Sequence, residues 1–161
     1  MTKFEYVEGS YVKKWFPEAA SQSFKQGQHV YLSASGLVTA CADNEIKVIG
    51  VADADASGTT NKWIPVILAL DDTVFAGSST NAGADVTLAV THIGKNYAVY
   101  VTSNSVYVDL GDTTNDLVHV VGVHPDCIPA SASLTLANST NGKVLFRFLA
   151  ANSQAMSLEV A

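Results

Sequence analysis

Apolar and polar residues alternate with a period of two along much of this chain, and that pattern limits the fold more than any other feature. It is clearest over residues 63–68, 98–101, 106–110 and 144–149. A period of two places successive side chains on opposite faces of a strand, whereas no stretch of a dozen residues shows the three-and-four spacing of an amphipathic helix. The sequence therefore predicts an all-β fold.

Clusters of Gly, Asn, Asp, Ser and Thr separate the alternating stretches. These residues tolerate or stabilise turns, and short strands between such turns are typical of a small barrel or sandwich. Pro65 lacks an amide proton, so we expect its strand to lie at a sheet edge or to contain a bulge. Gly50 falls inside a strand pattern, which indicates a bulge or a close approach of two backbones. The turn clusters are 33–36, 55–61, 77–83, 103–105, 111–115 and 137–142.

The chain divides into three regions: an amino-terminal arm over residues 1–20, a first β unit over 21–76 and a second β unit over 77–161. The boundary near 77 rests on the small residues of 77–83, which are typical of a linker or a long loop. The arm carries three basic and three acidic residues, so the net charge of -6 belongs to the two β units.

The composition excludes several classes of protein. Hydrophobic residues make up 48% and charged residues 15% of the 161 positions, so the chain has a real core and little charge. The basic residues are scattered, which argues against nucleic acid or an anionic membrane as a partner. The longest apolar run, residues 63–70, is far shorter than the roughly 20 residues of a spanning helix, and the first residues do not form a signal peptide. We expect a soluble protein made in the cytoplasm.

Aromatic residues are concentrated in the arm, which holds five of the fourteen in the chain. Exposed aromatics invite aggregation, so the arm either packs over its own domain or anchors on a partner. On the second interpretation the arm adds a strand to another sheet, and deleting residues 1–16 should abolish binding while leaving a folded protein. The candidate contact residues are Phe4, Tyr6, Tyr11, Trp15 and Phe16.

Cysteine and histidine are few and match no metal or catalytic motif. Cys41 and Cys127 are far apart and are expected to be buried apolar thiols. The four histidines are expected to be exposed or to have hydrogen-bond partners, because neither an HExxH motif nor a zinc spacing occurs. They are His29, His92, His119 and His124.

Paired carboxylates are the remaining candidates for chemistry. Asp53 and Asp55 lead into a turn, and Asp71 and Asp72 are adjacent. Such pairs can hold a weak cation or act in a small hydrolase through Asp53, Asp55 or Asp72, but the turn also explains them by local hydrogen bonding. Without a nucleophile or phosphate-binding motif, we expect no enzymatic activity, no cofactor and no metal.

Four segments in order resemble a β module of tailed-bacteriophage capsid decoration (cement) proteins. Residues 23–32 contain the pattern F-x-x-G-x-x-V-x-L, residues 36–40 follow as a glycine turn and a strand, residues 46–52 end in I-G-V-A, and residues 64–75 continue the similarity. This resemblance implies a β-tulip-like sheet or barrel module. Residues 107–110 and 142–148 resemble, more loosely, the extra β domain of longer family members, which implies a second small β-sandwich or barrel.

The resemblance also implies a function. Family members bind the major capsid protein on the outside of an assembled head, where they sit as trimers at local three-fold axes and clamp neighbouring subunits. A rival interpretation is a head fibre or a tail-associated adhesin that binds a host glycan through Tyr97, Tyr100 and Tyr107. Neither the particular capsid nor the role of the second β unit follows from the sequence.

Overall fold

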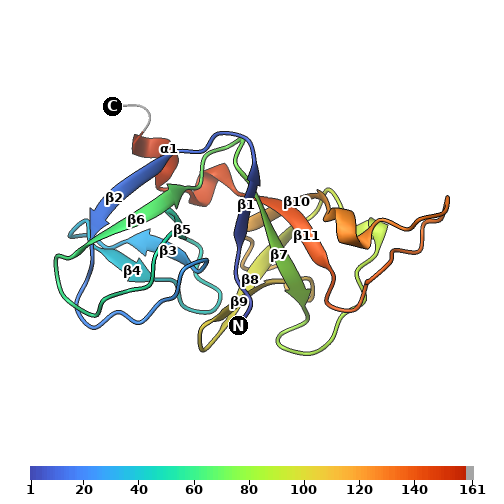
Figure 1. The fold of residues 1–161 in the computed structure, drawn as a ribbon, viewed down its shortest axis with the longest axis horizontal. Coiled ribbons are helices and arrows are strands. Elements are labelled where there is room, and N and C mark those ends of the chain that lie inside the picture. Colours follow the sequence, from blue (N-terminus) through green and yellow to red (C-terminus); the bar gives the residue numbers. More distant parts are fainter. Residues whose placement is uncertain (159–161) are drawn as a thin grey trace.

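The computed structural model describes residues 1–158 and confirms the all-β class (Figure 1). The first sheet has the order β2-β6-β5-β3-β4 and is built from β2 (Lys13–Pro17), β3 (His29–Leu32), β4 (Val38–Ala40), β5 (Gly50–Ala52) and β6 (Trp63–Leu68). The second has the order β1-β7-β11-β10-β8-β9 and is built from β1 (Glu5–Glu8), β7 (Val74–Thr80), β8 (Asn96–Thr102), β9 (Ser105–Asp109), β10 (Val118–Val123) and β11 (Lys143–Phe148). Short helical turns lie at Val90–His92, Pro125–Cys127 and Ala150–Asn152, and α1 covers Ala155–Leu158.

The second sheet closes on itself. Strand β7 pairs antiparallel with β11 and parallel with β9, so β7, β11, β10, β8 and β9 form a closed barrel of five strands. Closure removes the free edges of these strands, and β1 is added on the outside of the barrel along β7. The long connection between β10 and β11 projects away from the barrel (Figure 1).

The first sheet is antiparallel throughout and curls so that its ends approach each other. An isolated parallel bridge between Glu18 and Val38 brings the end of β2 next to β4. The small barrel or sheet modules expected from the sequence are therefore present in both halves of the molecule.

Strand β6 corrects the expectation for Pro65. It lies between β2 and β5, not at an edge, and its pairing shows no bulge. Pro65 is tolerated because β5 ends at Ala52, and beyond that point the amide of Asp53 donates to the Pro65 carbonyl at 2.9 Å. The nitrogen and the carbonyl of one strand residue point toward the same neighbouring strand. The Pro65 nitrogen therefore faces Asp53, just beyond the end of β5, where no regular β5–β6 hydrogen bond is lost.

Gly50 marks a close approach of two backbones, as expected. A Cβ atom at this position would lie 2.0 Å from the Ile67 carbonyl oxygen, so only glycine allows β5 to pack at this distance from β6.

The turn expected over residues 77–83 is shorter than the sequence indicated. Residues 77–80 form the second half of β7, and the turn itself is closed by hydrogen bonds between Asn81 and Ala84. A glycine is needed at position 77 of this strand, because a Cβ atom there would lie 2.5 Å from the ring of Phe4.

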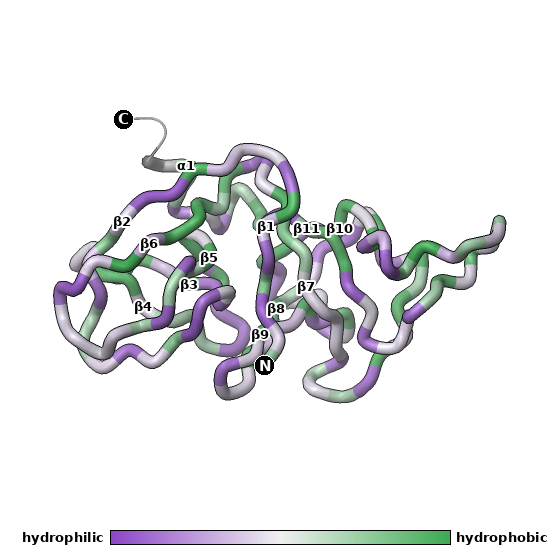
Figure 2. The backbone as a smooth tube through the Cα atoms, viewed as in Figure 1, coloured by the Kyte–Doolittle hydropathy of each residue, from purple (hydrophilic) through white to green (hydrophobic). Residues whose placement is uncertain are grey.

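Two apolar clusters form the core, and one of them joins the sheets. The cluster inside the first sheet includes Val30 and Ile64. The larger cluster fills the barrel but also contains Val48, Val51 and Ile67 from the other half of the chain. The two sheets are thus packed against each other through apolar side chains, and the apolar segments run along the middle of both lobes in Figure 2.

The C-terminal segment completes the first sheet. The Ser153 hydroxyl donates to the Ala69 carbonyl at 2.6 Å, and the side-chain amide of Gln154 brackets the main chain of Leu32 with bonds of 2.7 and 2.9 Å. Residues from both ends of the chain therefore belong to this half of the molecule.

Glu18 is fully buried and holds a loop in place. The amide and hydroxyl of Ser57 donate to Glu18 Oε2 at 3.0 and 2.6 Å, and the amide of Gly58 donates to Oε1 at 2.7 Å. A buried carboxylate is stable only with such partners, so this contact fixes the loop that leads into β6.

Candidate functional site

The structure separates the aromatic residues of the arm into buried and exposed groups. Phe4 is 2% exposed and packs on Phe146, so its ring belongs to the core and is not part of the exposed surface. Phe16 is half-buried and packs against the cluster inside the first sheet. The physical reason is that β1 and β2 are paired with β7 and β6, which turns part of the arm toward the molecule's own core.

Tyr6 and Tyr11 form a pair at the bend between β1 and β2. Their rings lie 4.9 Å apart in an edge-to-face arrangement, and the Tyr6 hydroxyl donates to the Gly9 carbonyl at 2.7 Å. Tyr11 is about half exposed. The pair stiffens the connection between the two sheets and leaves one aromatic ring at the surface.

The most exposed aromatic surface lies on the outer side of β2 and β6, and we call it the tryptophan face. It consists of Trp15, Pro17, Trp63 and Pro65, because Trp15 lies opposite Pro65 and Pro17 lies opposite Trp63. Directly opposed residues point to the same side of a sheet, as do residues two apart in one strand. Trp15 is 57% exposed and Trp63 is 59% exposed, and they are the two tryptophans of the chain.

The tryptophan face rests on a rigid support. Pro65 is buried, and the opposite side of the same strands supplies Ile64 and Val66 to the core. Two large aromatic rings on a well-packed sheet offer contact area without the entropic cost of ordering a loop. Trp63 was not among the sequence-based candidates, because its alternation with Ile64 puts the two side chains on opposite sides of β6 without showing which side is the outer one.

A polar network borders the tryptophan face. Lys13 forms an ion pair with Asp53, and Gln26 donates to the same carboxylate at 3.2 Å. The hydrogen bond to Asp53 raises the pKa of Lys13, with a smaller contribution from Tyr11, over whose ring the ammonium lies at 5.8 Å. The charges of Lys13 and Asp53 cancel, so this border offers directional polar contacts to the tryptophan face without adding net charge.

The first carboxylate pair, Asp53 and Asp55, is bound by neighbouring cationic and amide groups. The Gln26 amide and the Lys25 ammonium lower the pKa of Asp55, which they contact at 2.9 and 3.2 Å. Since Asp53 is bound by Lys13, both carboxylates of the first pair have cationic partners. Within residues 1–158, no three His, Cys, Asp or Glu side chains gather in a way that could hold a metal ion.

Asp72 binds Ser10 in the connection between β1 and β2. Its carboxylate accepts hydrogen bonds from the Ser10 hydroxyl at 2.7 Å and the Ser10 amide at 3.1 Å, and the hydroxyl bond is the main reason that its pKa is lowered. The Thr73 hydroxyl donates to the Ser10 carbonyl at 2.8 Å, so the β1–β2 connection is fastened from both sides.

Three histidines have hydrogen-bond partners, as expected, and one does not. His119 Nδ1 lies 2.7 Å from the Asn96 side-chain oxygen, while His92 and His124 accept from nearby amides. His29 is only 1% exposed, and in the described part of the chain neither of its ring nitrogens has a partner. The expectation for His29 is wrong because both sides of its strand are covered: Val30 faces the first core and His29 faces Phe148 of the second sheet.

Both cysteine thiols are buried, as expected. Burial raises the pKa of Cys41 well above its ordinary value, with a smaller contribution from Glu45. Cys127 lies in the short helical turn between β10 and β11, belongs to the larger apolar cluster and contacts main-chain carbonyls. Neither thiol has the exposed, electropositive setting of a reactive cysteine.

The tyrosines considered for glycan binding do not form one exposed surface. Tyr97 is 2% exposed, and burial raises its pKa. Tyr100 and Tyr107 are half-buried neighbours on β8 and β9 with ring centroids 6.3 Å apart. Tyr97 and Val99 lie on the side of β8 that faces the interior of the barrel, so Tyr97 is not at the surface.

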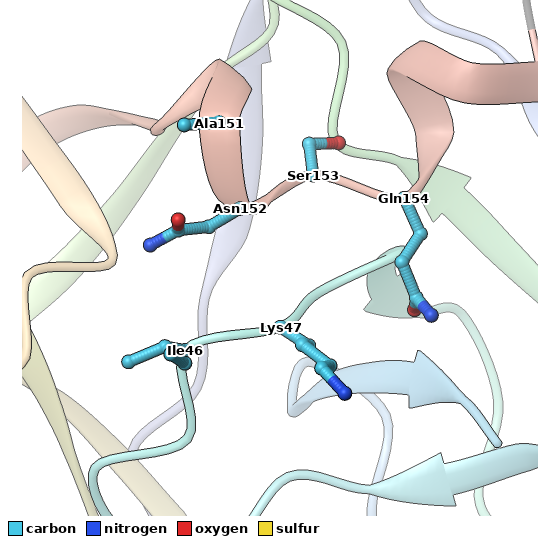
Figure 3. Close-up of a pocket in the computed structure, with 6 residues that line it drawn as sticks. All are labelled: Ile46, Lys47, Ala151, Asn152, Ser153 and Gln154. Carbon is cyan, nitrogen blue, oxygen red and sulfur yellow. The ribbon is translucent and has the colours of Figure 1, made fainter.

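A shallow pocket of about 330 Å³ lies at the seam between the C-terminal segment and the first half of the chain (Figure 3). Two of its polar side chains already hold that seam together, because Ser153 bonds Ala69 and Gln154 bonds Leu32. Asn152 instead donates to the Asp116 carbonyl in the second half of the chain. The pocket is therefore a consequence of packing more than a prepared binding site. Its lining residues are Ile46, Lys47, Ala151, Asn152, Ser153 and Gln154.

In the described residues, no helix has the length and apolar character needed to cross a membrane. No protein-family model, curated protein or solved structure matches this chain.

Proposed function

We propose that this chain is a capsid decoration protein that binds the outside of an assembled tailed-phage head through its tryptophan face. The observation that carries the proposal is the placement of both tryptophans, Trp15 and Trp63, on one outer surface where each is more than half exposed. Tryptophan is the residue type most enriched among the energetic anchors of protein interfaces. The resemblance of residues 23–75 to decoration proteins gives the class of partner.

In this proposal the partner is the major capsid protein, and the chain acts as a trimer at local three-fold axes. Each protomer contributes one tryptophan face, and Tyr11 extends that surface toward the β1–β2 bend. Three linked contacts raise the effective concentration, so a modest contact per protomer gives stable attachment. By binding the expanded shell better than its precursor, the protein stabilises the mature head through mass action. It acts by gripping neighbouring subunits and needs no catalytic group, cofactor or metal.

The test is binding to mature heads of the phage that encodes the chain, after removal of their own decoration subunits. The double variant Trp15→Ala/Trp63→Ala is compared with Ile128→Ala/Leu134→Ala, which removes two apolar side chains, 58% and 80% exposed, from the other half of the molecule. We expect the first variant to lose at least about a hundredfold in affinity, at roughly 1.4 kcal/mol per tenfold, and the second to bind as the unchanged protein does.

Two outcomes contradict the proposal. If the tryptophan variant saturates heads with unchanged affinity, the tryptophan face is not the docking surface. If the unchanged protein ignores mature heads but gives a clear signal on a glycan array that the same variant loses, the face binds sugars and the chain is an adhesin. Light scattering of the purified protein tests the trimer separately.

A further inference from the structure

His29 lies at the centre of a cluster of rings where the two sheets meet. We call this cluster the aromatic junction. The His29 ring is stacked on Phe148 of β11, with centroids 6.3 Å apart and planes 20° apart, and lies 5.9 Å from Phe4. Phe4 in turn packs on Phe146 at 4.8 Å. The junction thus joins the segment before β1, strand β3 of the first sheet and strand β11 of the second.

The imidazole is the one polar ring in this junction, and it has no hydrogen-bond partner for either nitrogen among residues 1–158. Burial alone lowers the pKa of His29 from 6.5 to about 3. The neutral ring fills apolar space without a polar interaction of its own, so its burial costs free energy that the surrounding packing must offset.

None of the neighbouring elements supplies a negative charge to stabilise a protonated ring. On β3 and β5 the immediate neighbours are Val30 and Val51. The segment after β4 contributes Cys41, whose amide donates to the His29 carbonyl and whose buried thiol stays neutral because its pKa is raised.

The charged groups next to the junction have partners elsewhere. On the β1 side Lys3 and Glu5 form an exposed ion pair at 3.9 Å. On β11 Arg147 is exposed and donates to the Asp71 carbonyl at 3.4 Å. The two buried carboxylates of the described chain, Glu18 and Asp109, are bound to loop amides away from the ring.

Phe4 is the part of the junction that can leave most easily. Its segment is held by two main-chain bonds, from the Phe4 amide to the Gly27 carbonyl at 2.8 Å and from the Val106 amide to the Thr2 carbonyl at 3.2 Å. Thr2 adds two more, because its amide donates to the Ser105 hydroxyl and its hydroxyl donates to the Val106 carbonyl, both at 3.1 Å. The following strand β1 has one neighbour, β7, and its pairing is interrupted between Tyr6 and Glu8. Release of this segment gives the His29 ring a path to water. It breaks the β1–β7 pairing but leaves the ladders of the first sheet and of the barrel intact.

We propose that the aromatic junction is an acid-sensitive latch, in which protonation of His29 is coupled to release of Phe4 and strand β1 from the place where the two sheets meet. The closed form holds the neutral ring, and the open form takes up a proton. Acid therefore favours the open form. With ordinary titration in the open form, the ratio of open to closed molecules rises about 70-fold between pH 7 and pH 4.5.

The experiment is amide hydrogen exchange on the full chain at several pH values, corrected for the intrinsic pH dependence of exchange. Protection of the Phe4 and Val106 amides should fall about 70-fold from pH 7 to pH 4.5. The Leu117 amide, which donates to the Tyr97 carbonyl inside the barrel, should keep its protection over the same range. In His29→Leu the pH dependence at Phe4 should disappear, whereas in His119→Leu, which changes a half-buried histidine outside the junction, it should remain.

Constant protection of Phe4 in the unchanged protein, or an identical pH dependence in His29→Leu, overturns the latch. If His29→Leu does not fold, the ring ¹⁵N shifts of His29 in the unchanged protein decide the question. Proton uptake by His29 must coincide with loss of protection at Phe4. A ring that becomes protonated while the Phe4 amide stays protected also overturns it.

Discussion

The ring of Phe4 meets the ring of Phe146 edge to face, with 4.8 Å between the ring centroids and 68° between the planes. This contact joins the first residues of the chain to its last strand. It lies in the larger apolar cluster, where Phe75 and Phe148 complete the group of rings. The amino-terminal segment is thus part of the core, and only its later aromatic residues remain for a partner.

Replacing Phe4 with alanine should destabilise the protein by about 3–5 kcal/mol, because the change leaves a cavity lined by aromatic rings. Val7→Ala, on the same segment but 41% exposed, should cost less than about 0.5 kcal/mol. Urea unfolding followed by circular dichroism measures both. Equal midpoints for the two variants would show that Phe4 is not a core residue.

Deleting residues 1–16 does more than remove a binding arm. It removes Phe4 from the core and strand β2 from the first sheet, so we expect the truncated chain to lose its cooperative unfolding transition. Point substitutions on the tryptophan face are therefore the better test of binding. Trp15→Ala and Trp63→Ala should each change the unfolding free energy by less than about 1 kcal/mol, since both rings are more than half exposed.

Glu18→Gln should destabilise the protein by roughly 2–4 kcal/mol, because the neutral amide replaces a charge-assisted acceptor and turns a donor toward the amides of Ser57 and Gly58. Glu8→Gln on the exposed part of β1 is the matched control and should be nearly neutral. Denaturant unfolding distinguishes the two. A neutral effect of Glu18→Gln would mean that the loop does not depend on the carboxylate.

Two glycine substitutions separate the effects of space and backbone conformation. In Gly50→Ala the new Cβ atom meets the Ile67 carbonyl oxygen, so β5 and β6 must move apart, and we expect a loss of more than about 3 kcal/mol. Gly36→Ala meets no atom within 4 Å but keeps a φ of +74°, which costs about 1–2 kcal/mol. Thermal or chemical unfolding should rank them in this order, and the reverse order would be inconsistent with the β5–β6 spacing.

Neither thiol should react with a water-soluble disulfide reagent in the native protein, because Cys41 and Cys127 are both buried. The high pKa of Cys41 reduces its reactivity further. Both should react after unfolding in guanidinium. Rapid labelling of one thiol under native conditions would indicate local opening at that position.

The local pattern was sufficient to predict strands, turns and their approximate positions. Period-two alternation correctly placed Val144, Phe146 and Phe148 on one side of β11, and the turn residues marked most of the connections. Gly50 also had the role that its position indicated, because a missing side chain in a strand has few explanations.

The pairing of distant segments could not be predicted from the same pattern. Alternation shows that His29 and Val30 point to opposite sides of β3, but not that a second sheet covers the His29 side. It likewise separates Trp63 from Ile64 without showing which side of β6 faces solvent. The choice depends on contacts between residues far apart in the chain, and those contacts leave no periodic signal.

The C-terminal clasp has a consequence for how the molecule is made. Ser153 and Gln154 bind Ala69 and Leu32, so the half of the fold translated first stays incomplete until residues 153 and 154 leave the ribosome. A nascent chain halted earlier lacks the bonds that these two side chains make to the first sheet.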